Sequence, residues 1–183
     1  MLSPNPAVKF TYEDYQHTPE DKRYELLDGE LIMVPAPNLE HQRIGAKLGT
    51  RLYTFVGGRD LGEVFFAPCD VVLSNTDVVQ PDLLFVSNER AHLLLGGDNV
   101  RGAPDLIVEI LSPSTAGQDR TLKRALYVKH GVKEYWLVDP DARTVTVLRL
   151  GEDAFEVEAI YGEGQTMSSP TLTGFSVGLN EIF

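Results

Sequence analysis

Cysteine is nearly absent from this chain of 183 residues, since Cys69 is the only one. A lone cysteine excludes an internal disulfide and favours a reducing, cytoplasmic setting. No stretch approaches the roughly 18 apolar residues that a membrane-spanning helix needs. Residues 1–10 also lack the basic start and apolar core of a signal peptide. We therefore expect a cytoplasmic protein with no membrane partner.

Positive charge is also scarce. Sixteen Lys and Arg residues stand against 27 Asp and Glu residues, which gives a net charge of −11. This balance argues against tight, non-specific nucleic-acid binding by the whole surface. The charge is unevenly spread, because residues 150–183 contain no Lys or Arg, whereas residues 115–133 are basic: Arg120, Lys123, Arg124, Lys129 and Lys133. That basic stretch could meet a phosphate, or it could be an ordinary solvated helix face.

Several familiar catalytic signatures are missing as well. The chain has no glycine-rich phosphate loop and no Gly-x-Ser-x-Gly nucleophile elbow. It has no cysteine pair and no closely spaced histidines that would indicate zinc. Chemistry based on carboxylates is therefore the main class left to consider.

Two acids stand inside apolar runs. Glu109 is in the middle of Asp105–Leu111, and Asp82 lies within Val78–Val86; both runs are typical of buried strands. A buried carboxylate is costly unless it is paired, hydrogen-bonded or bound to a cation. Either acid alone could be a structural carboxylate. If the two strands are neighbours, however, the acids lie about 5 Å apart at the backbone, and together they predict a shared divalent-metal site.

The order of expected elements predicts a mixed α/β fold. A short helix is expected near 11–21, and Asp28-Gly29 predicts a hairpin of strands 23–27 and 30–34. Asn38 can cap a helix that runs to about Val56. The remaining elements are a hairpin of strands 64–73 and 78–86, a strand at 105–111, a helix at 116–129, a strand at 134–139 and a last hairpin at 143–150 and 155–160. A strand–helix–strand unit of this length predicts a parallel crossover.

Four stretches together resemble a known family. The stretches are Val79-Gln-Pro-Asp-Leu-Leu84, Glu109-Ile-Leu-Ser-Pro-Ser-Thr115, Asp119…Lys123…Tyr127 and Gly131-Val-Lys-Glu-Tyr-Trp-Leu-Val-Asp-Pro140. With them the chain is similar to the Uma-two-type restriction endonucleases, a branch of the PD-(D/E)XK nuclease superfamily, over about residues 10–150. The resemblance implies a restriction endonuclease-like core ordered helix–strand–strand–strand–helix–strand. We expect one nuclease-like domain over 1–183, with its core at about 23–150 and a C-terminal hairpin and acidic tail at 151–183.

The resemblance also implies roles for individual residues. Asp82 and Glu109 match the two metal-binding acids, and the carbonyl of Ile110 would complete the metal site. The superfamily lysine should stand two residues after the second acid, where this chain has Leu111. Lys123, on the following helix, is the best candidate for a migrated lysine. An i,i+4 ion pair with Asp119 is its alternative interpretation.

These inferences predict a Mg²⁺- or Mn²⁺-dependent DNA endonuclease. Lys123 would orient the water or neutralise charge, and Lys123→Ala would abolish cleavage with folding nearly intact. Duplex DNA would follow the basic helix and the first long helix, through Arg120, Arg124, Lys47 and Arg51. Secondary candidates for the site are Glu40, His41, Asp70 and Asp119.

A homodimer is expected, because two sites related by a two-fold axis match the two strands of a duplex. The apolar residues near the C-terminus would offer surface to the partner: Phe175, Val177, Leu179, Ile182 and Phe183. Two alternatives stay open. One is a non-catalytic binding or assembly module that keeps the nuclease fold, and the other is a nuclease for RNA or a small nucleotide.

Overall fold

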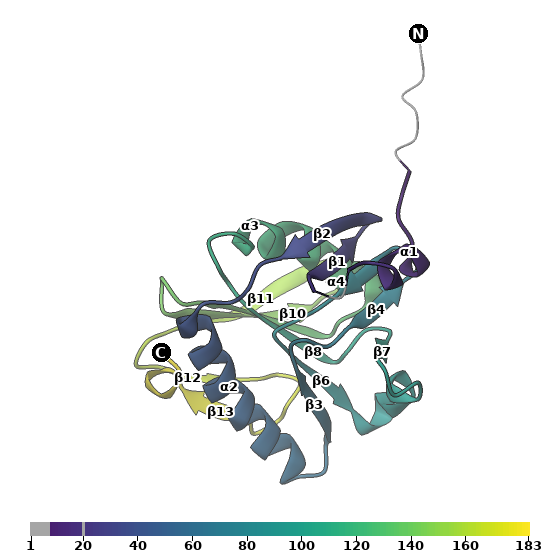
Figure 1. Cartoon of the computed structure of the whole chain (residues 1–183). Helices are drawn as coiled ribbons and strands as arrows, with labels where there is room; N and C mark the ends of the chain where they lie inside the picture. Colours follow the sequence, from purple (N-terminus) through teal and green to yellow (C-terminus); the bar gives the residue numbers. More distant parts are fainter. Residues whose placement is uncertain (1–7, 20) are drawn as a thin grey trace.

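The computed structural model describes residues 8–19 and 21–183. Residues 1–7 lie outside the described residues. They include most of the segment 1–10 that was considered above for a signal peptide. Two sheets dominate the fold (Figure 1). The larger has the order β11-β10-β9-β8-β6-β3, with bounds Phe155–Gly162, Thr144–Leu150, Glu134–Asp139, Leu106–Ile110, Leu83–Ser87 and Gly62–Phe66. The smaller has the order β2-β1-β5-β4-β7, with bounds Glu30–Val34, Arg23–Leu27, Asp77–Val79, Val71–Ser74 and Val100–Arg101. β12 (Thr166–Ser168) and β13 (Ser176–Gly178) form a separate pair.

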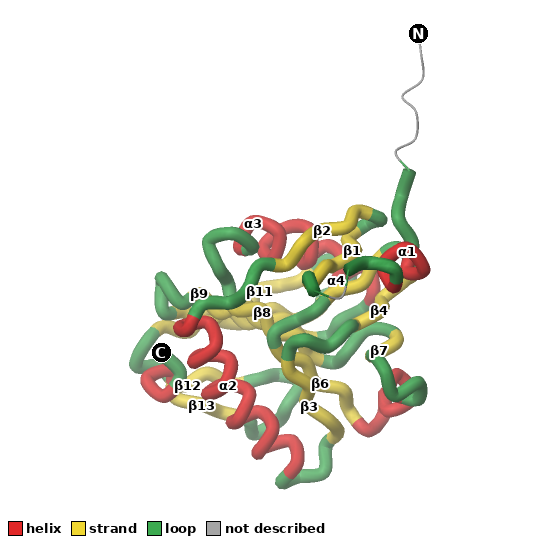
Figure 2. The backbone as a smooth tube through the Cα atoms, in the orientation of Figure 1, coloured by secondary structure: helices red, strands yellow, loops and turns green. Residues whose placement is uncertain are grey.

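Helices cover both faces of the larger sheet. α2 (Leu39–Gly57) begins at the Asn38 cap, whose side chain accepts from the His41 N–H, as expected. Its apolar stripe, Ile44, Leu48, Leu52 and Val56, packs on one face together with β12 and β13 (Figure 2). α4 (Arg124–His130) packs on the other face against the smaller sheet. The remaining helical segments are α1 (Tyr12–Gln16), η1 (Asn88–Leu94), α3 (Ala116–Gln118), η2 (Asp119–Lys123) and η3 (Leu179–Glu181).

The two long strands expected at 64–73 and 78–86 are each divided between the two sheets. β3 pairs with β6 in the larger sheet, whereas β4 pairs with β5 in the smaller one. The break falls at residues 67–70 on one side and 80–82 on the other, where Pro68 and Pro81 stand. Proline cannot donate to a ladder, so a pair of prolines ends regular pairing in both strands. Asp82 therefore lies at the split between the sheets and not inside a strand.

The crossover expected after Glu109 is present. β8 pairs with β9 in parallel, and the helical segment 116–130 connects them. β8 also pairs with β6 antiparallel, with Leu83 opposite Val108. The same register extended by one residue sets Asp82 opposite Glu109. Side chains alternate between faces along a strand, so Glu109 projects with Ile107 and Leu111 toward α4.

The helix expected at 116–129 is interrupted in its interior. Residues 119–123 form a π-helical turn, η2, between α3 and α4. A π turn is rare and is frequently found at functional sites. Here both Asp119 and Lys123 belong to it, and both are buried. Gly131, in the left-handed conformation, ends α4 as the sequence indicates.

The C-terminal segment packs on its own chain. Phe175, Val177, Leu179 and Ile182 are buried in the core with α2, so they do not form the partner surface expected from the sequence. The homodimer stays a prediction. Among residues 8–19 and 21–183, no helix combines the length and the apolar character required to cross a membrane.

Asp77 connects the smaller sheet to α4. Its fully buried carboxylate accepts from the Asp28 N–H at 2.8 Å, from Ser74 Oγ at 2.8 Å and from Lys129 Nζ at 3.1 Å, and it lies 3.0 Å from His130 Nε2. Burial alone would raise the pKa of Asp77. The surrounding hydrogen bonds outweigh burial and lower the pKa to about 2 from an ordinary 3.8.

Asp77 should make the fold sensitive to acid. A lowered pKa means that its stabilising effect is present above pH 3.8 and is lost as the pH falls toward 2. Chemical unfolding should show a loss of about 2 kcal/mol over that range, and Asp77→Asn should remove this component. The exposed Asp141→Asn is the matched control. Parallel curves for wild type and Asp77→Asn between pH 5 and pH 2 would contradict the assignment.

Candidate active site

A cavity of about 780 Å³ opens where the two sheets separate. Its walls come from the β1–β2 hairpin, the first half of α2, the start of β6, the end of β8 and the α3–η2 stretch. Six titratable side chains with possible roles in chemistry line it: Glu25, His41, Asp82, Glu109, Asp119 and Lys123. The volume falls within the roughly 300–1,000 Å³ of ordinary small-molecule sites.

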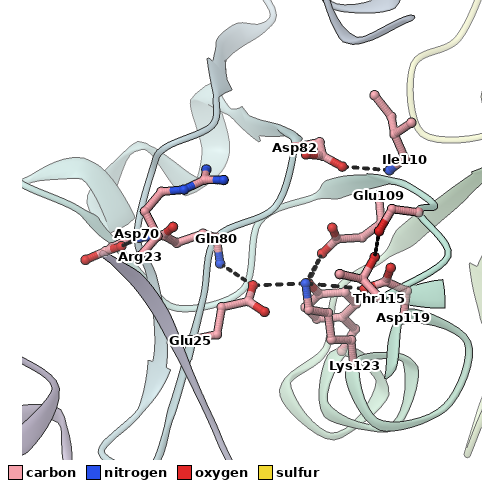
Figure 3. Close-up of polar contacts among 12 residues, drawn as sticks. Arg23, Glu25, Asp70, Gln80, Asp82, Glu109, Ile110, Thr115, Asp119 and Lys123 are labelled. Atoms are coloured by element: carbon pink, nitrogen blue, oxygen red, sulfur yellow. Dashed lines mark hydrogen bonds and ion pairs between the residues drawn. The ribbon is translucent and has the colours of Figure 1, made fainter. Parts of the chain in front are cut away.

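The Lys123 ammonium is the centre of a buried ionic cluster. Its Nζ lies 2.9 Å from Glu25 Oε1, 3.1 Å from Glu109 Oε1 and 3.4 Å from Asp119 Oδ1. Figure 3 shows the ammonium between the carboxylates of Glu25 and Glu109. Tyr127 donates to the same Glu109 oxygen at 2.7 Å. The predicted Asp119–Lys123 pair and the predicted approach of Lys123 to Glu109 therefore coexist.

Burial and charge act in opposite directions within this cluster. Burial lowers the pKa of Lys123, but the charges of Glu109, Glu25 and Asp119 outweigh it and raise the pKa well above its usual range. Lys123 is therefore a permanent cation. Burial raises the pKa of Glu109 strongly; Lys123 opposes this, and Asp119, Asp82 and Glu25 add to it.

Asp82 stands at the edge of the cluster, toward α2. Its Oδ2 accepts from the Ile110 N–H at 2.7 Å and lies 3.2 Å from His41 Nε2. Burial lowers the pKa of His41, but the hydrogen bond and charge of Asp82 outweigh burial and raise it, with a smaller contribution from the backbone of Ile110. His41, a secondary candidate from the sequence, therefore contacts Asp82, one of the principal candidates.

The acids of the cavity do not form a complete metal cage. Within the described residues, no three or more His, Cys, Asp or Glu side chains are grouped to hold a metal ion. Protein donors among the described residues bind Glu109 Oε1 and Asp82 Oδ2. No hydrogen bond from these residues reaches the other carboxylate oxygens, Glu109 Oε2 and Asp82 Oδ1. Mg²⁺ typically binds through one or two carboxylates, several waters and substrate phosphates. Asp82, Glu109 and the Ile110 carbonyl fit such a set.

The other secondary candidates have different surroundings. Asp119 belongs to the Lys123 cluster. Glu40 is exposed on α2 and does not line the cavity. Asp70 lies on the far side of Gln80, where its Oδ1 accepts from Tyr15 Oη and Gln80 Nε2, both at 2.8 Å.

The four basic residues expected to bind DNA do not line the cavity. Each is engaged within the chain: Lys47 with the carbonyls of Ile182 and Phe183, Arg51 with Glu181, Arg120 with Asp139 and Arg124 with the carbonyl of Phe155. The guanidinium that does line the cavity belongs to Arg23, whose Nη2 donates to the Pro35 carbonyl at 3.1 Å.

Sequence reasoning missed Glu25. It is buried on β1, accepts from the Gln80 N–H at 2.8 Å and binds Lys123. Its signal was faint, because β1 is a short hairpin strand and not a long apolar run. The one indication was a charged residue placed beside Leu26 and Leu27, both of which are fully buried.

Fold and site together define a mixed α/β protein whose two sheets separate at a cavity lined by carboxylates and a buried lysine. Over residues 11–180 the chain matches the model of the Uma2 family, described as "Putative restriction endonuclease". The chain belongs to this family, which confirms the resemblance read from the sequence.

Two other proteins are similar to it. The crystal structure of a "putative nuclease belonging to DUF820" from Anabaena variabilis ATCC 29413 superposes with a TM-score of 0.79 at 22% identity, covering 95% of this chain and 97% of that one. This similarity confirms the expected fold. An uncharacterized protein from Synechocystis sp. (strain PCC 6803) is 28% identical over 138 residues, which is 73% of each chain.

Lys123 should be essential for stability as well as for any chemistry. Removing the ammonium leaves three buried carboxylates uncompensated, so Lys123→Met should lower the free energy of unfolding by about 3–5 kcal/mol at pH 8. The loss should shrink at pH 5, where the acids take up protons. This replaces the expectation that Lys123→Ala leaves folding intact. Denaturant unfolding measures it.

The matched control is Arg149→Met, which removes an exposed pair with Glu158 and should cost no more than about 1 kcal/mol. Adding Glu109→Gln to Lys123→Met should recover part of the lost stability. Equal stability of the Lys123 and Arg149 variants would contradict the central role of the cluster.

Proposed function

We propose that this protein hydrolyses phosphodiester bonds in DNA with Mg²⁺ or Mn²⁺. One observation carries the proposal. Asp82, just before β6, and Glu109 of β8 line the same cavity, each with one oxygen held by protein donors, beside the buried Lys123 cation. Mg²⁺ is commonly held by one or two carboxylates together with waters and substrate phosphates.

Asp82, Glu109 and the Ile110 carbonyl would hold the ion. When bound, such an ion lowers the pKa of a water molecule and offsets charge that develops on the phosphate. The protein groups have separate tasks. Tyr127 and Lys123 hold Glu109 in place through Oε1, and the Ile110 N–H does the same for Asp82 through Oδ2.

Lys123 and His41 differ in the proton chemistry open to them. The raised pKa of Lys123 rules out a role as general base and leaves a fixed charge that stabilises an anionic transition state. Asp82 raises the pKa of His41 and contacts its Nε2, so His41 is placed to give a proton to a leaving oxygen.

Metal binding and cleavage should depend on the same two acids. Asp82→Asn and Glu109→Gln should each abolish Mn²⁺ binding in calorimetry and Mn²⁺-dependent cleavage of DNA, because each removes an anionic ligand while retaining shape. Asp141→Asn, an exposed acid outside the cavity, should leave both unchanged. Wild-type Mn²⁺ affinity in both acid variants would overturn the metal assignment.

A different pattern would favour the alternative of a non-catalytic binding module. In that case wild type would bind DNA and leave every DNA and RNA substrate intact in Mg²⁺ and Mn²⁺. The buried ionic cluster would then serve only to join the sheets.

Arg23 should contact substrate phosphate, in place of the basic helix expected from the sequence. It lines the cavity, and its charge is close enough to affect His41. Arg23→Gln should raise KM several-fold with a smaller effect on kcat, measured by initial-rate cleavage. Arg120→Gln, whose guanidinium is paired with Asp139 outside the cavity, is the matched control. A larger rise in KM for Arg120→Gln would instead support the expected binding of nucleic acid along the basic helix.

A further inference from the structure

We infer that the cavity binds an unpaired nucleobase on the ring of Phe66, so that the substrate is a single-stranded or locally unpaired nucleic acid. This inference rests on the proposed nuclease function and narrows its substrate class. Its starting point is an aromatic ring that the fold leaves partly uncovered. Phe66, at the end of β3, has 42% of its surface exposed and lines the cavity.

The ring lies close to the proposed chemistry. Phe66 is paired with Leu83, and the next residue, Ala67, donates its N–H to the Asp82 carbonyl at 3.0 Å. Phe66 therefore lies on the segment whose backbone is hydrogen-bonded to that of Asp82. A base stacked on this ring would place its own phosphate a short distance from the two acids.

The helix beneath the ring is built to receive it. A methyl group at Gly49 of α2 would clash with the Phe66 ring and would lie 2.9 Å from Leu83 Cδ2. Glycine in a helix interior costs about 1 kcal/mol relative to alanine, and here it lets the ring lie directly on the helix. Phe66 also lines a second cavity, of about 590 Å³, so its side chain borders both.

The cavity wall has a charged part that suits a phosphate and an apolar part that suits a base. Arg23 supplies positive charge on the side of the cavity that holds His41 and Asp82, where a phosphate would lie. Apolar side chains line other parts of the same wall: Met33, Pro35, Pro37, Ala46, Phe66 and Pro68. The second cavity, lined by Glu63, Asp70 and Asp98, would repel a phosphate, so the backbone is expected to keep to the Arg23 side of Phe66.

Duplex DNA does not suit this arrangement. Bases within a duplex are stacked on one another, and an aromatic side chain can cover a base face only after that base leaves the stack. A duplex would also need a basic track outside the cavity. The residues expected to supply one are paired within the chain, and the net charge is −11.

The test is binding of fluorescein-labelled 12-nucleotide probes, followed by anisotropy in EDTA and in Ca²⁺. The probes are one single-stranded DNA, its RNA counterpart, the same DNA with a central abasic residue, and the blunt duplex. Wild type should bind the single-stranded DNA or RNA at least 5-fold more tightly than the duplex or the abasic strand. The DNA and RNA arms identify which sugar is preferred.

Four substitutions at Phe66 and one at Gly49 test the role of the ring. Phe66→Ala and Phe66→Leu should weaken single-strand binding by about 5- to 150-fold, which corresponds to about 1–3 kcal/mol of base stacking. Phe66→Tyr should retain it, and Gly49→Ala should weaken it by displacing the ring. Tyr53→Ala, an exposed aromatic on α2 outside the cavity, is the matched control. The fluorescence of the Phe66→Trp variant should be quenched by the single strand and not by the abasic strand.

Tighter binding of duplex than of single strand would overturn the inference, and so would wild-type affinity in Phe66→Leu. Its failure is distinguishable from failure of the nuclease proposal. If Mn²⁺-dependent cleavage of duplex is insensitive to Phe66→Leu, the base-binding site is refuted and the nuclease proposal stands. If single strands bind in a Phe66-dependent way and no metal supports cleavage, the base-binding site is supported and the nuclease proposal is refuted.

Discussion

The ammonium of Lys123 is the group on which this structure depends. It joins carboxylates from three separate segments: Glu25 of β1, Glu109 of β8 and Asp119 of η2. All four side chains are buried. In a poorly solvated interior an unpaired charge is very costly, so three acids can share this space only around a cation. The smaller sheet, the larger sheet and the crossover helix are thereby held in one fixed arrangement.

The position of the cavity follows from this constraint. Two sheets share the hairpin from β3 to β6, and the prolines at its break turn the chain from one sheet to the other. Asp82 is at the break, where no further strand pairing occupies its side chain. The π turn brings Asp119 and Lys123 of the helix to the same point. Packing, and not a flexible loop, therefore positions the acids, which is what precise metal and phosphate chemistry requires.

Local signals were sufficient for many elements. Asp28-Gly29 marks the β1–β2 hairpin, Asn38 marks the start of α2, and the apolar strands around a basic helix mark the parallel crossover. Asp82 and Glu109 could be selected because acids inside apolar runs are unusual. Lys123 could be selected because it lies on the helix after the Glu109 run, whereas Leu111 occupies the position of the family lysine. Glu25 could not, because its burial depends on Lys123 and Gln80, which lie far away in the sequence.

The sequence by itself determined the α/β class and the family, and it selected Asp82 and Glu109 as candidates, because periodicity, turn chemistry and local motifs act over a few residues. Only the tertiary structure decided how each charge is used. Lys47, Arg51, Arg120 and Arg124 form a basic set in the sequence, yet each is engaged within the chain, whereas Arg23 lines the cavity. The apolar C-terminal residues likewise entered the core against α2. The availability of a side chain depends on which distant partners the fold brings within a few ångströms, and no local pattern encodes that.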